Sequence, residues 1–302
     1  MTQRNRAEGW EHAKRSGHQR EIDLAAELRS DSKFSSWFHE EIFGTPESIA
    51  PLVATSGASM DRVPSVLGDL TIPKIDFEVV WPHSDEATTR VSLKKSETGQ
   101  VWLVTRDRFV RGFEAQFDQS VPDVVVEGLR LFIGPLNESE MMQELAGRPL
   151  FGGISRSSGV PQELHQRRFV AATLDAYFRE IWRETLGWFR SETHRIADLC
   201  FCRGLAAQPE HYASGLLYSI NDPSSGAVGN HYFGLTELTN RIQSLAPELR
   251  AFAGPRSGGS TVILPFGFLQ MHNPRPRGQA SWNNQLQFHH QLKKLQALFS
   301  SR

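Results

Sequence analysis

The sequence predicts an α/β (α+β) protein, in which helices and a compact group of strands both contribute to a folded core. Two stretches near the amino terminus and a long one at residues 162–205 carry apolar residues at helical spacing. Between them, residues 72–105 alternate apolar and polar side chains and are divided by short turn-forming clusters, as strands are. The composition of the 302 residues, 39% hydrophobic and 22% charged, is typical of a folded protein rather than a disordered one.

The first predicted elements are helices. Residues 17–29 are expected to form an amphipathic helix, because apolar residues recur every three or four positions. Residues 31–43 are rich in aromatic side chains and are expected to form a second helix, which ends at Gly44. Residues 56–69 carry Ser, Gly and Asp and are expected to be loop or short helix.

Three strands are predicted next, at 72–81, 88–95 and 100–105, with polar turns between them. A helix is expected to start within 109–117, and residues 121–133 form a strongly apolar segment.

The second half of the chain is expected to begin after a Gly/Ser-rich loop at 152–161. We therefore predict a core at 1–150 and a second region at 151–302, or one continuous domain. The predicted elements of the second region are a long helical region at 162–205, strands within 216–234, a helix at 236–250, a strand at 261–268 and an amphipathic helix at 285–299.

Net charge, cysteine content and the length of apolar runs bear on three properties of the protein: its partners, its metal sites and its association with membranes. The net charge of −1 gives no hint of a nucleic-acid partner, although a cleft can be basic while the rest of the surface is acidic. Cys200 and Cys202 are too few for a structural zinc site, and we expect two buried thiols in a reducing cytoplasm. The first residues lack the apolar region of a signal peptide, and no apolar run is long enough to cross a bilayer, so we expect no membrane association.

The strand block contains a set of residues suited to phosphodiester hydrolysis. Alternation places Ser92 and Lys94 on one face of their strand, and Asp76 on the preceding antiparallel strand can lie beside Lys94. Glu78 shares the face of Asp76, and Glu21 projects from the first helix. Carboxylates can hold Mg²⁺, and a lysine can orient the attacking water or stabilise charge on the phosphate. The alternative is an ordinary cross-strand ion pair.

Three segments resemble the motifs of the PD-(D/E)XK nuclease superfamily, and within it the type II restriction endonucleases. They are SGHQRE ending at Glu21, KID ending at Asp76, and VSLKKS around Lys94 with the following GQV at 99–101. The resemblance covers about residues 14–117. It implies a central mixed sheet flanked by helices, with additional helices and strands in the C-terminal half. It also implies Asp76 as metal ligand, Lys94 as catalytic lysine and Glu21 as an auxiliary acid.

The sequence departs from the family pattern at two positions. Ser92 stands where the superfamily usually has Asp or Glu, and Ile75 stands where it has proline. Glu21, Glu78 or Glu114 is expected to replace the missing acid. Two alternatives remain open: a sequence-specific DNA-binding protein whose nuclease site has decayed, and a repair nuclease of the same superfamily.

The resemblance also implies partners. They are double-stranded DNA, a second copy of the chain in a homodimer, and a DNA methyltransferase that protects the host. Arginine and amide side chains are expected to contact DNA phosphates and base edges. The candidates are Arg106, Arg108, Arg111, Asn273, Arg275 and Arg277.

Overall fold

The computed structural model describes residues 20–45, 53–56, 62–81, 88–133, 143–147, 171–221, 228–245, 261–271 and 285–300. The chain forms two compact units, and each unit is built from two separate stretches of sequence. Unit 1 comprises Met1–Glu97 and Phe201–Leu238, and unit 2 comprises Thr98–Cys200 and Thr239–Arg302. Both units draw on residues from each side of position 150, where the sequence predicted a division.

Unit 1 contains a five-stranded mixed sheet in the order β1-β4-β5-β7-β8. Its neighbouring strands are antiparallel, except that β5 and β7 run parallel. Strand β5 is therefore the central strand, and the predicted mixed sheet is confirmed. The strands are β1 (Val53–Ser56), β4 (Phe77–Val80), β5 (Thr88–Lys94), β7 (Gly215–Asn221) and β8 (Val228–Gly234).

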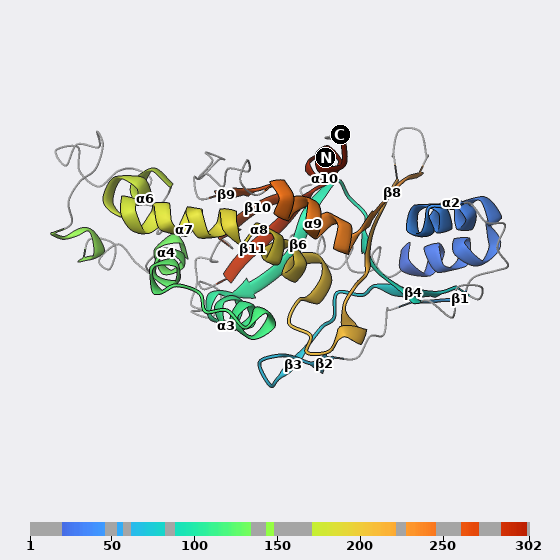
Figure 1. The fold of residues 1–302 in the computed structure, drawn as a ribbon, viewed down its shortest axis with the longest axis horizontal. Helices are drawn as coiled ribbons and strands as arrows, with labels where there is room; N and C mark the ends of the chain where they lie inside the picture. Colours follow the sequence, from blue (N-terminus) through green and yellow to red (C-terminus); the bar gives the residue numbers. More distant parts are fainter. Residues whose placement is uncertain are drawn as a thin grey trace, which may run out of the picture. The chain divides into compact units, whose positions relative to one another are not determined.

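Two helices flank this sheet, as predicted (Figure 1). The first covers residues 20–30, and the second is α2 (Ser32–Phe43). Asp31 separates them, and its carboxylate accepts hydrogen bonds from two backbone N–H groups in the first turn of α2. Gly44 ends α2 with a left-handed φ of 75°, a conformation that costs glycine little. The apolar sides of both helices pack on β4, β5 and β7, through Leu24, Leu28, Phe38, Phe77, Val79, Val91, Leu93 and Leu217.

Strand alternation gives β5 two chemically different faces. Val91 and Leu93 enter the core beneath the helices. Ser92 and Lys94 therefore project from the opposite face. The helices thus fix which side of the sheet carries the polar residues.

The segment before β4 differs from the expectation. Where loop or short helix was predicted at 56–69, strand β1 ends at Ser56, and β2 (Val63–Pro64) then pairs with β3 (Leu70–Thr71) in a small hairpin. The strand predicted at 72–81 is shorter, since only β4 pairs regularly with β5.

Unit 2 contains a four-stranded sheet in the order β6-β11-β10-β9, with every neighbouring pair antiparallel. Strand β6 follows β5 in the sequence but pairs with β11. The strands are β6 (Thr98–Thr105), β9 (Thr261–Leu264), β10 (Gly267–Met271) and β11 (Gln285–Gln291).

The prediction of one helix at 285–299 was wrong. Residues 285–291 form β11, and only Leu292–Ser300 is helical, as α10. Leu286, Phe288 and His290 are buried at every second position, which is strand periodicity, and the helical spacing of leucines begins only at Leu292. His289 and His290 therefore lie on a strand rather than a helix.

Helices surround an aromatic core in unit 2. The indole of Trp102 stacks on Phe288 at 5.7 Å, and Phe109 lies 5.4 Å from Phe288. The long helix expected at 162–205 is divided into several shorter ones in its described part. The helices are α3 (Arg106–Phe117), α4 (Asp123–Ile133), α6 (Ala171–Tyr177), α7 (Arg179–Ser191), α8 (Thr193–Asp198) and α9 (Leu235–Leu245), the last of which begins in unit 1.

Both cysteines lie in a π-helical turn, Leu199–Arg203. They are free thiols, as expected, but only Cys200 is fully buried. In the described part of the chain, no helix combines the length and the apolar character needed to cross a membrane.

Candidate active site

Asp76 is held against the central strand of unit 1. It lies immediately before β4, and its backbone N–H donates to the Val91 carbonyl at 2.8 Å. Its carboxylate Oδ2 accepts a hydrogen bond from the backbone N–H of Leu93 at 2.6 Å, and the Ser92 hydroxyl lies 3.4 Å from the same oxygen. The hairpin between β4 and β5 thus fixes this carboxylate beside the middle of the sheet.

Lys94 completes a short polar chain with Ser92 and Asp76. The ammonium Nζ donates to the Ser92 hydroxyl at 2.9 Å and to the Leu93 carbonyl at 3.1 Å. Ser92 is 2% exposed and therefore links the lysine and the acid away from bulk water. We call Asp76, Ser92 and Lys94 the acid–serine–lysine trio.

The charge on Lys94 is poorly solvated. Burial lowers the pKa of Lys94 below its usual 10.5, and this is the largest influence on it. The charge of Asp76 raises this pKa, Lys95 lowers it, and Glu21 raises it. The trio therefore contains an ammonium group that gives up its proton more readily than a surface lysine does.

Glu21 reaches the same end of β5 from the first helix. Its side chain is buried, with the residue 7% exposed, and its Oε1 lies 3.6 Å from Nζ of Lys95. Glu21 also acts on the pKa of Lys94. The acid predicted from the helix is thus near the trio, in an ion pair with the neighbouring lysine.

Glu78, the other predicted acid, lies on β4 and forms an ion pair with Arg90 of β5 at 3.2 Å. Within the described ranges, no three His, Cys, Asp or Glu side chains gather in a group that could hold a metal ion. Asp76, Glu21 and Glu78 are therefore not brought together as one ligand set. Glu114, a further acid considered, is in unit 2 and accepts from the backbone N–H of Val121.

The oxygen atoms around Lys94 are nevertheless suited to bind a hard cation. The Asp76 carboxylate, the Ser92 hydroxyl and the Leu93 carbonyl supply oxygens at one place on the sheet, and the hydroxyl and the carbonyl already accept hydrogen bonds from the ammonium group. Mg²⁺ prefers oxygen ligands and is commonly held by one or two carboxylates, with waters and substrate phosphates completing its shell. The residues present therefore fit Mg²⁺ held by a single protein carboxylate.

The predicted arginines belong to unit 2. Arg106, Arg108 and Arg111 lie in the first turns of α3, which begins three residues before the helix start that the sequence predicted. Arg106 forms an ion pair with its neighbour Asp107 at 2.8 Å, and Arg111 is exposed. The remaining predicted DNA contacts, Asn273, Arg275 and Arg277, lie outside the described residues.

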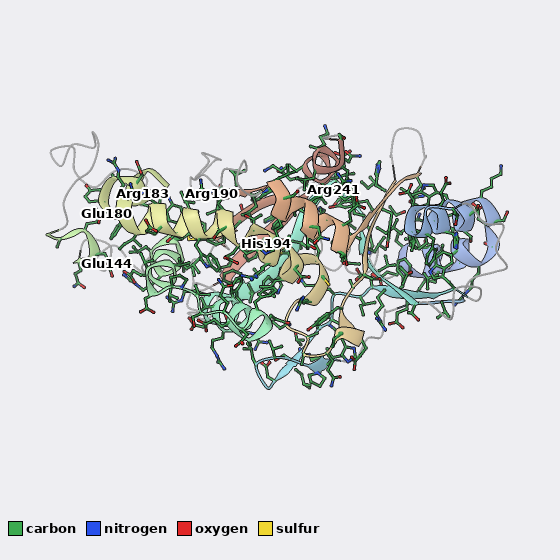
Figure 2. All side chains as sticks on the ribbon, viewed as in Figure 1. Glu144, Glu180, Arg183, Arg190, His194 and Arg241 are labelled. Carbon is green, nitrogen blue, oxygen red and sulfur yellow. The ribbon has the colours of Figure 1, made fainter. Side chains whose placement is uncertain are left out.

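Unit 2 carries further charged groups along its helices (Figure 2). Glu180, Arg183 and Arg190 are exposed on α7. Burial lowers the pKa of His194 on α8, and the guanidinium of Arg241 on α9 lies over the Phe299 ring at 4.4 Å. The charged groups on α7 face solvent, and Arg241 packs on an aromatic ring. These residues do not form a second cluster like the acid–serine–lysine trio.

The sequence did not reveal two contributors to the site. One is the backbone of Leu93, whose N–H binds Asp76 and whose carbonyl binds Lys94. The other is Lys95, the partner of Glu21. The double lysine at 94–95 was a signal for the second, because alternation directs adjacent lysines to opposite faces.

No protein-family model matches the chain, and no curated protein matches it. Among solved structures, the restriction endonuclease MspI in complex with its cognate DNA is similar over 89% of this chain and 83% of that one, with 10% sequence identity and a TM-score of 0.44. A likeness of this size does not establish a family or an activity.

Proposed function

We propose that this chain is a Mg²⁺-dependent, site-specific endonuclease that hydrolyses phosphodiester bonds of double-stranded DNA, as a type II restriction enzyme does. The observation that carries the proposal is the partly buried Lys94, linked through Ser92 to the carboxylate of Asp76 just before β4. A perturbed lysine next to an acid is typical of a catalytic site.

The residues have distinct roles in this proposal. Asp76 would hold Mg²⁺, which when bound neutralises phosphate charge and lowers the pKa of water. Ser92 positions the amine of Lys94 through their hydrogen bond. Because burial enlarges the neutral fraction of Lys94, its amine is suited to accept a proton from the attacking water.

The reaction balances without another reactant. The water oxygen bonds to phosphorus opposite the leaving oxygen as Lys94 takes a proton from the water, and the phosphorus–leaving-group bond breaks. The leaving oxygen takes a proton from solvent, and Lys94 releases its proton to solvent. The charge of Glu21 raises the pKa of Lys94 and so opposes the effect of burial, and the ion pair with Lys95 at 3.6 Å limits this opposition. A two-fold DNA target would be matched by a homodimer, and a methyltransferase would protect host DNA.

Plasmid cleavage tests the proposal. With Mg²⁺, wild-type protein should give discrete fragments, and Lys94→Met should lose about 10²–10⁴-fold in rate, the range of general acid–base contributions. Lys33→Met is the matched control, because Lys33 is exposed on α2 and lies outside the trio.

Other outcomes favour the alternatives. DNA binding without cleavage under any divalent metal would favour a binding protein with a decayed nuclease site. Nicks that follow DNA structure rather than sequence would favour a repair nuclease.

A further inference from the structure

We infer that the exposed face of the β2–β3 hairpin in unit 1 is a wedge for the minor groove of double-stranded DNA, where it favours base steps that unstack easily. This inference rests on the proposed function in taking duplex DNA as the ligand. It concerns a surface that the acid–serine–lysine trio does not include, and it requires no metal.

The β2–β3 hairpin is a short antiparallel pair whose two faces differ in exposure (Figure 1). Pro64 lies opposite Leu70, and Val63 lies opposite Thr71. Because opposed residues share a face and neighbouring residues alternate, Pro64, Leu70 and Ile72 lie on one face. Leu70 is 55% exposed and Ile72 is 67% exposed, whereas Val63 and Thr71 are half-buried on the other face. Scattered exposed apolar residues are ordinary, but three on one face form a patch that a partner can cover.

The backbone beneath this patch is held in place. The Val66 N–H donates to the Leu205 carbonyl at 2.9 Å, and the Ala207 N–H donates to the Pro64 carbonyl at 2.9 Å. Ser65, between these two hydrogen bonds, is buried. The exposed apolar side chains therefore stand on a fixed hairpin rather than on a free loop. Such preorganisation lowers the entropic cost of inserting them into a ligand.

The charge on the exposed face complements a polyanion. Arg62 stands at the next position beyond Val63, opposite Ile72, and is exposed. Asp69, the one acid between positions 62 and 72, lies on the other face, where it accepts a hydrogen bond from the hydroxyl of Ser65. The exposed face thus combines apolar side chains with a positive charge and carries no negative one.

This combination matches the chemistry of the DNA minor groove. Proteins that kink DNA insert Leu, Ile or Pro side chains between base pairs from the minor groove, and the negative potential of the groove attracts arginine. Insertion unstacks the bases, and it costs least at flexible pyrimidine–purine steps such as TA. The hairpin therefore selects DNA by its deformability, without hydrogen bonds to base edges.

Two duplexes of the same base composition isolate this property. One alternates T and A along each strand and is rich in TA steps, and the other pairs a run of A with a run of T and is stiff. Both present the same hydrogen-bonding groups in the minor groove. Fluorescence anisotropy in EDTA should show that the full-length wild type binds the alternating duplex about tenfold more tightly, which is within the range of sequence-dependent bending energies. Equal affinities, or tighter binding of the stiff duplex, would overturn the inference.

Variants on the exposed face locate the preference. Leu70→Ser and Ile72→Ser each remove an exposed apolar side chain, and each should reduce the preference for the alternating duplex to about threefold or less, because the wedge is shortened. Val228→Ser is the matched control, since Val228 is an apolar residue on β8 of unit 1 that is 42% exposed. It should keep the wild-type preference. A preference that Leu70→Ser and Ile72→Ser also keep would show that the hairpin is not the wedge.

Unstacking of the bases is measured on the wild type and needs no variant. 2-Aminopurine, placed at the A of one TA step in the alternating duplex, fluoresces more strongly when it loses its stacking neighbour. Saturating wild-type protein should raise this fluorescence, and an unchanged signal would contradict insertion at such steps.

A second copy of the chain is the other candidate to cover this face. Sedimentation velocity on wild type and Ile72→Ser tests it. If the substitution converts a dimer to a monomer while the preference for the alternating duplex persists, the face is a protein interface and the inference is wrong.

Failure of the wedge and failure of the nuclease function are distinguishable, because none of these measurements requires cleavage. A plasmid left intact by wild type, together with loss of the preference in Ile72→Ser, supports the wedge and overturns the nuclease function. A plasmid cut into discrete fragments, together with equal affinity for the two duplexes, overturns the wedge and supports the nuclease function.

Discussion

Both sheets carry a row of hydrogen-bonded polar side chains across neighbouring strands, but the two rows differ in charge. In unit 1 the row runs from Lys94 through Ser92 to Asp76. In unit 2 it consists of amides, in which Gln270 donates to Gln287 at 3.0 Å and Gln287 donates to Gln100 at 2.7 Å.

The difference shows what distinguishes the row that we propose to be catalytic from the row of amides. Strand alternation produces both, and a polar pattern in the sequence does not tell them apart. The amides are neutral and satisfy one another near solvent, so burial costs them little. The ammonium group of Lys94 is partly buried, which lowers its pKa and suits it to the role that we propose for it.

The largest expected effect comes from removing the negative charge of the row in unit 1, which brings it closer to the neutral row of amides in unit 2. Asp76→Asn keeps the shape of the side chain but removes the negative charge that would hold the cation in the proposed function. Cleavage initial rates should fall at least about 10²-fold, a loss of electrostatic stabilisation comparable to removing one oxyanion donor. Unchanged circular dichroism would show that the fold is intact, and unchanged cleavage would contradict the assignment of Asp76.

The second-largest expected effect is a loss of stability at Phe288, which lies on the same strand as Gln287 of the amide row. Phe288→Ala removes a fully buried ring that packs on Trp102 and Phe109. Urea unfolding should show a loss of about 3–5 kcal/mol, the usual range for a buried phenylalanine. Lys293→Met, an exposed change on α10 of the same unit, should change stability by less than about 0.5 kcal/mol, as surface substitutions usually do.

The third effect is a gain in stability at the trio. Lys94→Met removes a poorly solvated charge and keeps the length of the side chain. Since folded proteins often sacrifice stability at functional sites, the free energy of unfolding should rise by about 1 kcal/mol. A loss of stability would mean that the hydrogen bonds of Lys94 outweigh its desolvation, and the contrast between the two rows would fail.

The smallest effect is a pH dependence beside the amide row. Burial lowers the pKa of His289 below 6.5, and its Nε2 lies 3.0 Å from the Gln270 amide nitrogen. Between the lowered pKa and 6.5 the unfolded chain binds more protons than the folded one, so stability falls as pH drops through this window. Unfolding at pH 7.5 and 5.0 should show a smaller decline in His289→Gln than in wild type.

Local patterns in the sequence were sufficient to predict part of this structure. The two first helices and the hairpin of β4 and β5 depend on residues close in sequence, and their predictions are confirmed. The same hairpin places Asp76, Ser92 and Lys94 together, because alternation and one turn determine the faces. The catalytic roles of these residues stay a prediction.

Long-range pairing could not be predicted from the sequence. The parallel partner of β5 is β7, where Leu93 lies opposite Leu217, and nothing local to either strand specifies that pairing. The change from strand to helix after Gln291 was missed for a related reason. The spacing of Leu286, Phe288 and Leu292 is compatible with both a strand and a helix. The strand at 285–291 depends on backbone pairing with β6 and β10, which are distant in the sequence or not specified by it locally.

The interleaving of the two units has a consequence for synthesis on the ribosome. Strand β5 is made early, but its neighbour β7 begins at Gly215, more than a hundred positions later. Until then one side of β5 has unpaired backbone groups, which makes a nascent or prematurely terminated chain prone to self-association. Ribosomes that stall before this point would therefore release an aggregating fragment without an assembled sheet.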